Sequence, residues 1–160
     1  MSIEKVRAYF RALGMEERIR EFPVSSATVE LAAAALSCEP GRIAKTLAFS
    51  VRERPVLIVA AGDARVDNAR FKERFGVKAK MMSHEETAEK TGHAVGGVCP
   101  FALPGDVEVC LDESLRRFGT VFPACGSGNS AIELTIPELE RYVRGAVWVD
   151  VCRDWRRTEE

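Results

Sequence analysis

The sequence predicts an α+β fold, a single domain over residues 1–160 with a mixed central sheet. Three observations carry this prediction. The length of 160 residues is typical of one domain. Segments rich in β-branched and aromatic residues come in pairs, which helical patterns interrupt without strict alternation. Neither a G-x-G-x-x-G motif after a first strand nor a Walker motif is present, so the sequence carries no nucleotide-cofactor signature.

Helices are predicted where apolar residues recur at helical spacing or where capping residues mark an end. Apolar residues recur in this way over Ile3–Leu13. In the sequence SSATVELAAAAL, Ser26 or Thr28 is the expected N-cap. Ser83 and Glu86 have the spacing of a capping box. The remaining helices are expected at residues 66–76, 113–119 and 137–143.

Six β-rich segments are expected to share one central sheet. They are Ala44–Val51, Val56–Ala60, Val107–Leu111, Thr120–Cys125, Ser130–Thr135 and Ala146–Cys152. Residues 78–82 are predicted to form a further short strand.

The charge pattern limits the possible partners. The net charge of −1 argues against a general nucleic-acid coat, and we expect no DNA partner. Residues 42–80 nevertheless hold ten Lys/Arg against four Asp/Glu, whereas residues 81–114 hold one against seven. The basic block is either a solvated surface or a phosphate-facing patch. No apolar run approaches the roughly 18 residues of a membrane span, so we expect a soluble, cytoplasmic protein without a membrane partner.

The cysteines and histidines indicate no metal site and no cofactor. The histidines are interpreted as ordinary polar residues, and most of the cysteines as small buried hydrophobic residues in a reducing compartment. No C-x-x-C pair occurs, and no set of ligands has metal-site spacing. The residues concerned are Cys38, Cys99, Cys110, Cys125, Cys152, His84 and His93.

Lys45 is the first candidate for chemistry. On a strand starting at Ile43, it lies on the same face as Leu47 and Phe49, whereas Thr46 lies on the opposite face among small residues. A lone ammonium on a bulky apolar face is either a residue whose stem lies along apolar surface or a functional group.

Two loops are the other candidates. Residues 92–106 are rich in glycine and proline yet contain apolar residues, so they form either a tight buried corner or a ligand loop in which Gly96 and Gly97 bring backbone N–H groups close to a ligand. The turn Gly126-Ser127-Gly128-Asn129 is either a plain hairpin or a pocket wall, with its backbone donors and the Asn129 amide facing a ligand.

The segments TVELAAAALSCEPGRIAKTLAFSV, GGVCPFALP, LDESLRRFGTVFPACGSGNSAIEL and TIPELERY together resemble the YbaK/ProX family, in order and over about residues 22–144. This family also occurs as the editing domain inserted in bacterial prolyl-tRNA synthetases. The resemblance implies a compact domain with a mixed, barrel-like central sheet flanked by helices. It also implies hydrolysis of the ester that links a wrong amino acid to tRNA.

Several residues match the family pattern. Lys45 matches the lysine that the family needs for activity, and Thr46 matches the small polar residue after it. The sequence GGVCP matches the substrate loop, in which Cys99 stands where many members have serine. The resemblance implies a catalytic role for Lys45. It implies substrate binding by Thr46, Gly96, Gly97, Val98, Cys99, Pro100, Gly126, Ser127 and Asn129.

Three positions depart from patterns in the family. Ala102 replaces a glycine that is common there. Ala124 and Ala131 stand where the branch specific for cysteinyl-tRNA has serine and aspartate, so we do not expect that branch's substrate preference here.

The leading hypothesis is a freestanding trans-editing aminoacyl-tRNA deacylase. In it, Lys45 and the Gly96–Pro100 backbone loop orient the ester of a mischarged tRNA while a water attacks it. An aminoacyl-tRNA synthetase is a possible further partner. The alternatives are a non-catalytic module that binds aminoacylated RNA or a small metabolite, and a hydrolase with Cys99 as its nucleophile.

Overall fold

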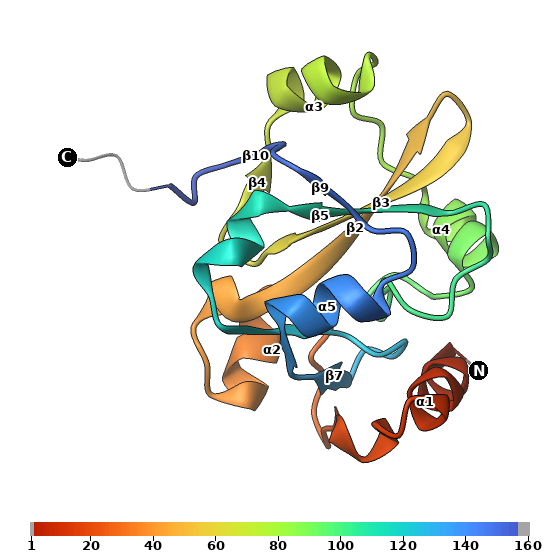
Figure 1. Ribbon diagram of the computed structural model, residues 1–160, viewed down its shortest axis with the longest axis vertical. Coiled ribbons are helices and arrows are strands. Elements are labelled where there is room, and N and C mark those ends of the chain that lie inside the picture. Colours follow the sequence, from red (N-terminus) through yellow and green to blue (C-terminus); the bar gives the residue numbers. More distant parts are fainter. Residues whose placement is uncertain (1, 157–160) are drawn as a thin grey trace.

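The computed structural model describes residues 2–156 and is built on a six-stranded mixed sheet in the order β8-β6-β2-β3-β5-β9 (Figure 1). β2 and β3 pair antiparallel over their whole length, and β6 and β8 also pair antiparallel. The pairs β2–β6, β3–β5 and β5–β9 are parallel. The strands are β2 (Ile43–Val51), β3 (Arg54–Ala61), β5 (Glu108–Asp112), β6 (Thr120–Pro123), β8 (Leu134–Thr135) and β9 (Val147–Val149).

Two small antiparallel sheets complete the β-structure. In one, β1 (Ile19–Glu21) pairs with β7 (Ser130–Ile132). In the other, β4 (Arg65–Val66) pairs with β10 (Cys152–Arg153). The expected α+β fold with a mixed central sheet is confirmed, and each of the six predicted segments contributes to that sheet.

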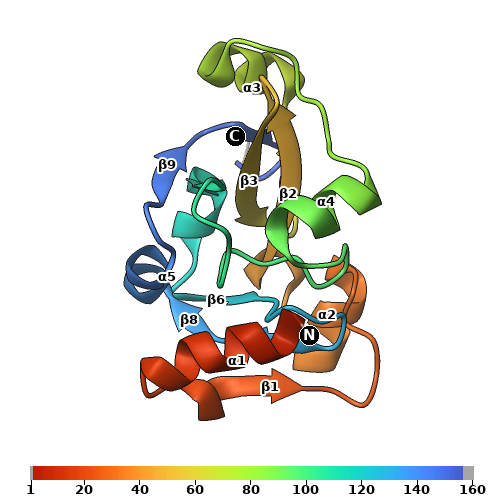
Figure 2. The same cartoon turned by 90° about the vertical axis from the view of Figure 1, so that its right-hand side faces the viewer.

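Within residues 2–156, five α-helices surround the sheet. In Figure 2, α1 and β1 cross one end of the molecule, α3 lies beyond the β2–β3 hairpin, and α4 and α5 lie on opposite sides of it. Thr28, not Ser26, caps α2 through its side chain, and the Ser83–Glu86 capping box is present. The helices are α1 (Ser2–Ala12), α2 (Val29–Leu36), α3 (Asn68–Phe75), α4 (His84–Thr91) and α5 (Ile136–Tyr142), and short 3-10 turns occupy Glu16–Arg18, Pro40–Arg42 and Glu113–Arg117.

One main core spans the sheet. It joins Phe10 of α1 and Phe71 of α3 to the buried strands β3 and β5. A smaller cluster lies under α2, where Leu36 packs with Phe22 and Phe122. In β2 the small residues Ala44 and Ala48 enter the main core, as do Phe49 and Val51 farther along, while Lys45 and Leu47 are half-buried. The bulkier face of β2 is therefore the more open one at this point of the strand.

Three predicted strands differ from the structure. Residues 78–82 contribute only a single bridge, between Met81 and Phe49. The segment 130–135 divides at the exposed Glu133 into β7, which pairs with β1, and β8, which pairs with β6. The tight hairpin that was one of the two interpretations of residues 126–129 is accordingly absent, because β7 pairs with β1. The last strand breaks after β9, where the Val151 N–H donates to Asp112 Oδ1 at 2.9 Å.

Ala102 stands in the left-handed region, with φ of 56°, at the position where the family commonly has glycine. Left-handed backbone costs an L-residue roughly 1–2 kcal/mol, and the extra freedom of glycine in the unfolded chain returns roughly 0.4–1 kcal/mol of that. We therefore expect Ala102→Gly to raise the free energy of unfolding, measured with urea, by roughly 0.5–1 kcal/mol.

Ala94→Gly is the matched control, because Ala94 is an exposed loop residue of the same region without a positive φ. It should lower the free energy of unfolding by roughly 0.4–1 kcal/mol. If both variants are destabilised alike, Ala102 is not strained.

Candidate functional site

The candidate site lies at the edge of β2 where its pairing with β6 ends. β2 pairs with β6 only through Ile43–Phe122 and Ala44–Pro123. Farther along the same edge, the Ser50 N–H donates to Lys80 O and Ala48 O accepts from the Met82 N–H. Backbone groups on a strand alternate between its two edges, so the Thr46 N–H and C=O point to the same open edge as those of Ala48 and Ser50. Between these two covered stretches, at Thr46, the edge of β2 has no neighbouring strand among the described residues.

A cavity of about 280 Å³ lies at this unpaired stretch, and we call it the edge cavity. Its walls come from the start of α2, from β2, from the loop at residues 95–98 and from the segments on either side of residues 126–129. Alanine and other apolar residues dominate these walls, so the cavity suits a small group. The lining includes Ser26, Ala27, Lys45, Thr46, Gly96, Val98, Ala124 and Ala131.

Lys45 also borders a second, larger hollow of about 680 Å³, which we call the outer groove. This groove is more polar, because Glu30, Asp63, Arg65 and Asn68 line it. Val29, Lys45 and Leu47 line both hollows, and Lys45 alone of these three is charged.

The amine of Lys45 is fixed by the turn that follows β3. It donates to Ala64 O and, at 3.5 Å, to Gly62 O. A Cβ on Gly62 would come within 2.2 Å of Pro40 O, so only glycine allows the turn to lie here. Burial lowers the pKa of Lys45 below its usual value. An ammonium has three N–H donors, and one therefore remains for a ligand.

Of the predicted substrate loop, Gly96 and Val98 line the edge cavity. The Gly97 N–H donates to Ala94 O at 2.9 Å, and a Cβ on Gly97 would come within 2.6 Å of Ser127 N. Gly97 therefore allows the loop to pack directly against the turn at residues 126–128. Cys99 is fully buried behind the loop and does not line the cavity.

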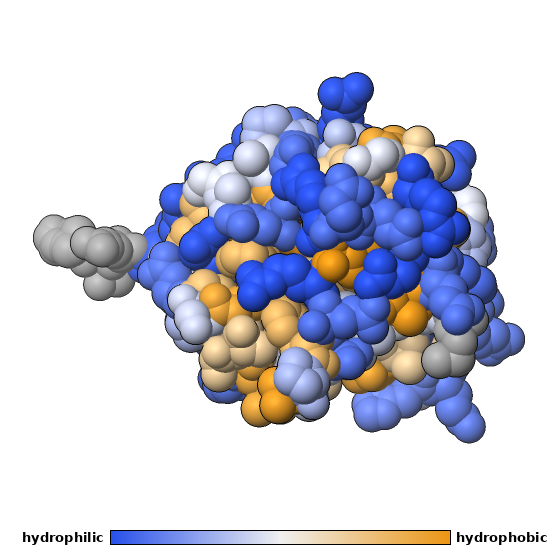
Figure 3. Space-filling view, turned by 90° about the horizontal axis from the view of Figure 1, so that it is seen from below, coloured by the Kyte–Doolittle hydropathy of each residue, from blue (hydrophilic) through white to orange (hydrophobic). Residues whose placement is uncertain are grey.

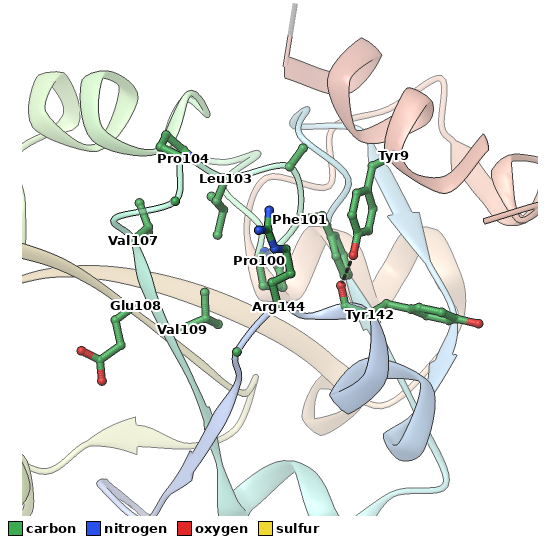
Figure 4. Close-up of a pocket in the computed structure, with 13 residues that line it drawn as sticks. Tyr9, Pro100, Phe101, Leu103, Pro104, Val107, Glu108, Val109, Tyr142 and Arg144 are labelled. Atoms are coloured by element: carbon green, nitrogen blue, oxygen red, sulfur yellow. Dashed lines mark hydrogen bonds between the residues drawn. The ribbon is translucent and has the colours of Figure 1, made fainter. Parts of the chain in front are cut away.

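Pro100 belongs to another hollow, of about 320 Å³, between α1 and the residues after α5 (Figure 4). Tyr9 of α1 lies at its edge and donates to Tyr142 O, and the Arg144 side chain lies near Pro100 and Phe101. Pro100 is therefore separated from Lys45, although the leading hypothesis has Lys45 and the Gly96–Pro100 loop orient one ester.

Gly126, Ser127 and Asn129 do not line the edge cavity either. The Asn129 amide donates to Phe22 O at 3.0 Å, and its side-chain oxygen accepts from the Ser127 hydroxyl at 2.9 Å. The neighbouring Gly128 O accepts from the Ser26 N–H at 2.7 Å. The turn thus holds the segment before α2 in place, and with it the Ser26 wall of the cavity.

His93 is completely buried, which corrects its interpretation as an ordinary polar residue. Its Nε2 lies 2.8 Å from Phe101 O, and its Nδ1 contacts the Ser2 hydroxyl. A carbonyl only accepts, so Nε2 carries the hydrogen and Nδ1 accepts from Ser2. Burial lowers the pKa of His93, and the neutral ring joins α1 to the loop at residues 92–101.

A histidine does therefore stand beside Cys99, with 3.6 Å between Sγ and Nε2. It cannot act as a base toward the thiol, because the hydrogen of Nε2 is directed at Phe101 O. Burial raises the pKa of Cys99 to about 12. Cys99 is accordingly a buried thiol without the features of a nucleophile.

Sequence reasoning did not identify the cavity walls formed by Ser26, Ala27 and Ser130. In the sequence, Ser26 stands out only as a candidate cap, and Ala124 and Ala131 only as departures from one branch of the family. All three line the cavity. The end of the molecule that carries α1, α2 and β7 is seen face-on in Figure 3, where hydrophobic residues gather between hydrophilic ones.

A family model for the aminoacyl-tRNA editing domain matches residues 24–142. This chain belongs to the aminoacyl-tRNA editing domain family. The match covers β2 with Lys45, the loop at residues 95–98 and the turn at residues 126–129. The resemblance to the YbaK/ProX family is thereby confirmed.

Relatives of this editing domain include the uncharacterized protein YwhH of Bacillus subtilis, which is 53% identical over 97% of this chain and 99% of that protein. The proline–tRNA ligase of Bacillus velezensis is 31% identical over 56% of this chain, but the match spans only 16% of the ligase. A crystal structure described as a candidate trans-editing enzyme for prolyl tRNA synthetase superposes with a TM-score of 0.85, at 29% identity and with 95% and 97% of the two chains covered.

Residues 2–156 also bear on two other kinds of site. None of the helices described is long and apolar enough to cross a membrane. Within the same residues, no group of three or more histidine, cysteine, aspartate and glutamate side chains could hold a metal ion.

The depressed pKa of His93 predicts a pH dependence of stability. The unfolded chain binds this proton near pH 6.5, whereas the folded editing domain binds it only at lower pH. The unfolded state therefore holds more protons below about pH 6.5, and stability falls as pH falls. Between pH 7.5 and 5.5 we expect this group to remove up to roughly 1.4 kcal/mol from the free energy of unfolding, measured with urea.

His84→Gln is the matched control, because His84 is exposed at the start of α4. This variant should keep the pH dependence that His93→Gln loses. Following the His93 ring resonance by NMR over the same pH range tests the prediction in the wild-type protein, without a variant. A His93 ring that titrates at or above pH 6.5 would contradict the prediction.

Proposed function

We propose that this chain is a trans-editing aminoacyl-tRNA deacylase. In the reaction, a water oxygen attacks the carbonyl carbon of the aminoacyl ester, and the bond from that carbon to the ribose oxygen breaks. The products are the free amino acid and a tRNA with its terminal hydroxyl restored. Membership of the editing-domain family supports this reaction class.

The observation that carries the proposal is the position of Lys45 between two hollows of different character. The small apolar edge cavity suits the side chain of an amino acid, and the larger polar outer groove suits the terminal nucleotide of a tRNA. The scissile ester then lies beside the lysine. An ammonium in a half-buried site stabilises the charge that develops on the ester oxygen more strongly than it would in water.

The loop at residues 95–98 faces Lys45 across the edge cavity. The Gly97 N–H is already used within its turn, so Gly96 and Val98 are the loop residues proposed to contact the aminoacyl group. An aminoacyl ester is an activated ester, and its hydrolysis by a positioned water needs orientation more than a protein nucleophile. Cys99 has no part in this mechanism.

The tRNA is proposed to be one that a proline–tRNA ligase charges. The ligase relative and the trans-editing neighbour both support this choice. Arg65 of the basic block lines the outer groove, which supports contact with tRNA phosphates at that groove. A proline–tRNA ligase is the proposed source of the mischarged substrate.

We expect Lys45→Met to lower kcat/KM for deacylation of a mischarged tRNA by roughly 100- to 1000-fold, the usual effect of removing a group that stabilises transition-state charge. Methionine keeps most of the apolar stem, so the fold should survive. Lys45→Ala should be equally inactive. Deacylation is measured by the release of labelled amino acid, and circular dichroism checks the fold.

Lys72→Met is the matched control, because Lys72 lies in the same basic block on an exposed face of α3. It should leave kcat/KM within about twofold of wild type, since surface charges contribute little at a distance. A variant Lys45→Met as active as Lys72→Met would refute the role of Lys45. If no mischarged tRNA is deacylated but one is bound, the chain is a binding module.

Cys99→Ser distinguishes a thiol mechanism from the proposed one. We expect it to retain most of the activity, because Cys99 is buried and its pKa is raised to about 12. A serine without a base is far less nucleophilic than a thiolate, so a thiol mechanism predicts near-complete loss. Loss of activity in a folded Cys99→Ser protein, beside an active Lys45→Met, would favour the thiol.

A further inference from the structure

Two residues that line the edge cavity have hydroxyl groups without a hydrogen-bond partner. These residues are Ser26 and Thr46, and both oxygens are shielded from solvent. Thr46 is only 9% exposed. Within residues 2–156 the only other buried side-chain oxygen or nitrogen without a partner is Asp150 Oδ1, so two of these three atoms belong to residues of one small cavity.

Buried hydroxyls without partners are unusual, because each one loses its hydrogen bonds to water and gains none in return. A serine or threonine hydroxyl has one donor and two acceptor sites, and it can rotate to meet a ligand. Neither oxygen is exposed in the cavity as the side chains stand, but a rotation about χ1 can bring each hydroxyl to the cavity wall. In Thr46 the hydroxyl then takes the position of a methyl group of similar size.

Resting on the proposed function, we propose that the amino acid removed by this site carries a hydroxyl on its β-carbon, as serine and threonine do. The hydroxyls of Ser26 and Thr46 recognise that group by hydrogen bonds. They come from two separate segments of the cavity wall, the chain before α2 and strand β2. A ligand hydroxyl between them can donate to one and accept from the other.

The remaining walls leave room for a side chain of the size of serine or threonine. Ala32, Ala44, Ala124 and Ala131 line the cavity together with larger apolar residues, and its volume is about 280 Å³. No charged residue other than Lys45 lines it. Lys45 is bonded to carbonyls on the side of the outer groove, so it does not compete for the ligand hydroxyl.

The α-amino group of the substrate has a different partner available. The Thr46 C=O points to the open edge beside the cavity, because the pairing of β2 with β6 stops at Ala44. A carbonyl oxygen can accept from the α-ammonium group of any amino acid. This contact therefore does not distinguish serine from alanine. The two hydroxyls thus remain for the side chain.

The test uses one proline tRNA charged in turn with serine, alanine, threonine and valine. Within the pairs serine–alanine and threonine–valine the members are close in size and differ in the hydroxyl. Two neutral hydrogen bonds, worth roughly 2- to 10-fold each, predict that the wild-type protein removes serine at least roughly 4-fold faster than alanine in kcat/KM. Threonine and valine should differ in the same direction.

Thr46→Val and Ser26→Ala are the variants, and Ser25→Ala is the matched control. Ser25 is an exposed neighbour outside the cavity, and its hydroxyl accepts from the Ala27 N–H at 3.2 Å. Each cavity variant should reduce the serine–alanine ratio of kcat/KM by roughly 2- to 10-fold. The Ser25→Ala variant should keep the wild-type ratio. Thr46→Val should unfold at a urea concentration no lower than wild type, since it removes an unpaired buried hydroxyl.

Three outcomes would overturn the inference. Equal removal of alanine and serine by the wild-type protein would do so while leaving the deacylase function intact. An equal loss on serine and alanine in Thr46→Val would show that the hydroxyl serves a group common to both substrates. Failure to remove any of the four amino acids, or any other, from any tRNA would refute the proposed function, and the inference with it.

Discussion

The incomplete pairing of β2 is the constraint on which the rest of this structure depends. On one edge, β2 is paired with β3 through eight residues, from Ala44 to Val51. On the other edge, it is paired with β6 through only two, and residues 80–82 cover it again from Ala48 onward. A sheet interrupted in this way keeps the stability of a long hairpin and leaves one opening between covered stretches of a strand.

Much of the fold could be predicted from the sequence because its signals are local. Helical spacing and capping residues located the helices, and β-rich segments located the six strands of the sheet. The breaks within strands could not be predicted, because distant residues cause them. Glu133 O accepts from the Arg18 guanidinium and the Glu133 carboxylate bonds Arg42, so the chain turns there from one sheet to the other.

The candidate site was predictable only in part, for a related reason. Lys45 and Thr46 are marked by the strand pattern and by the family motif, and Gly96 by its loop. Asn129 has the same kind of local signal, yet its amide already donates a hydrogen bond to Phe22 O. Ser26 has no such signal, because its importance arises when the turn at residues 126–129 holds its segment against β2. A sequence shows which groups could bond, and only the fold shows which are already bonded.

The adjacency of Lys45 and Thr46 follows from the same open edge. Consecutive residues on a strand point to opposite faces of a sheet, so inside a sheet they cannot serve one site. At an unpaired edge no neighbouring strand separates the two faces, and both side chains can border one hollow, as they do here. The cation can then act on the ester while the hydroxyl one residue later contacts the amino acid. A lysine on an apolar strand face is therefore explained by where the neighbouring strand ends.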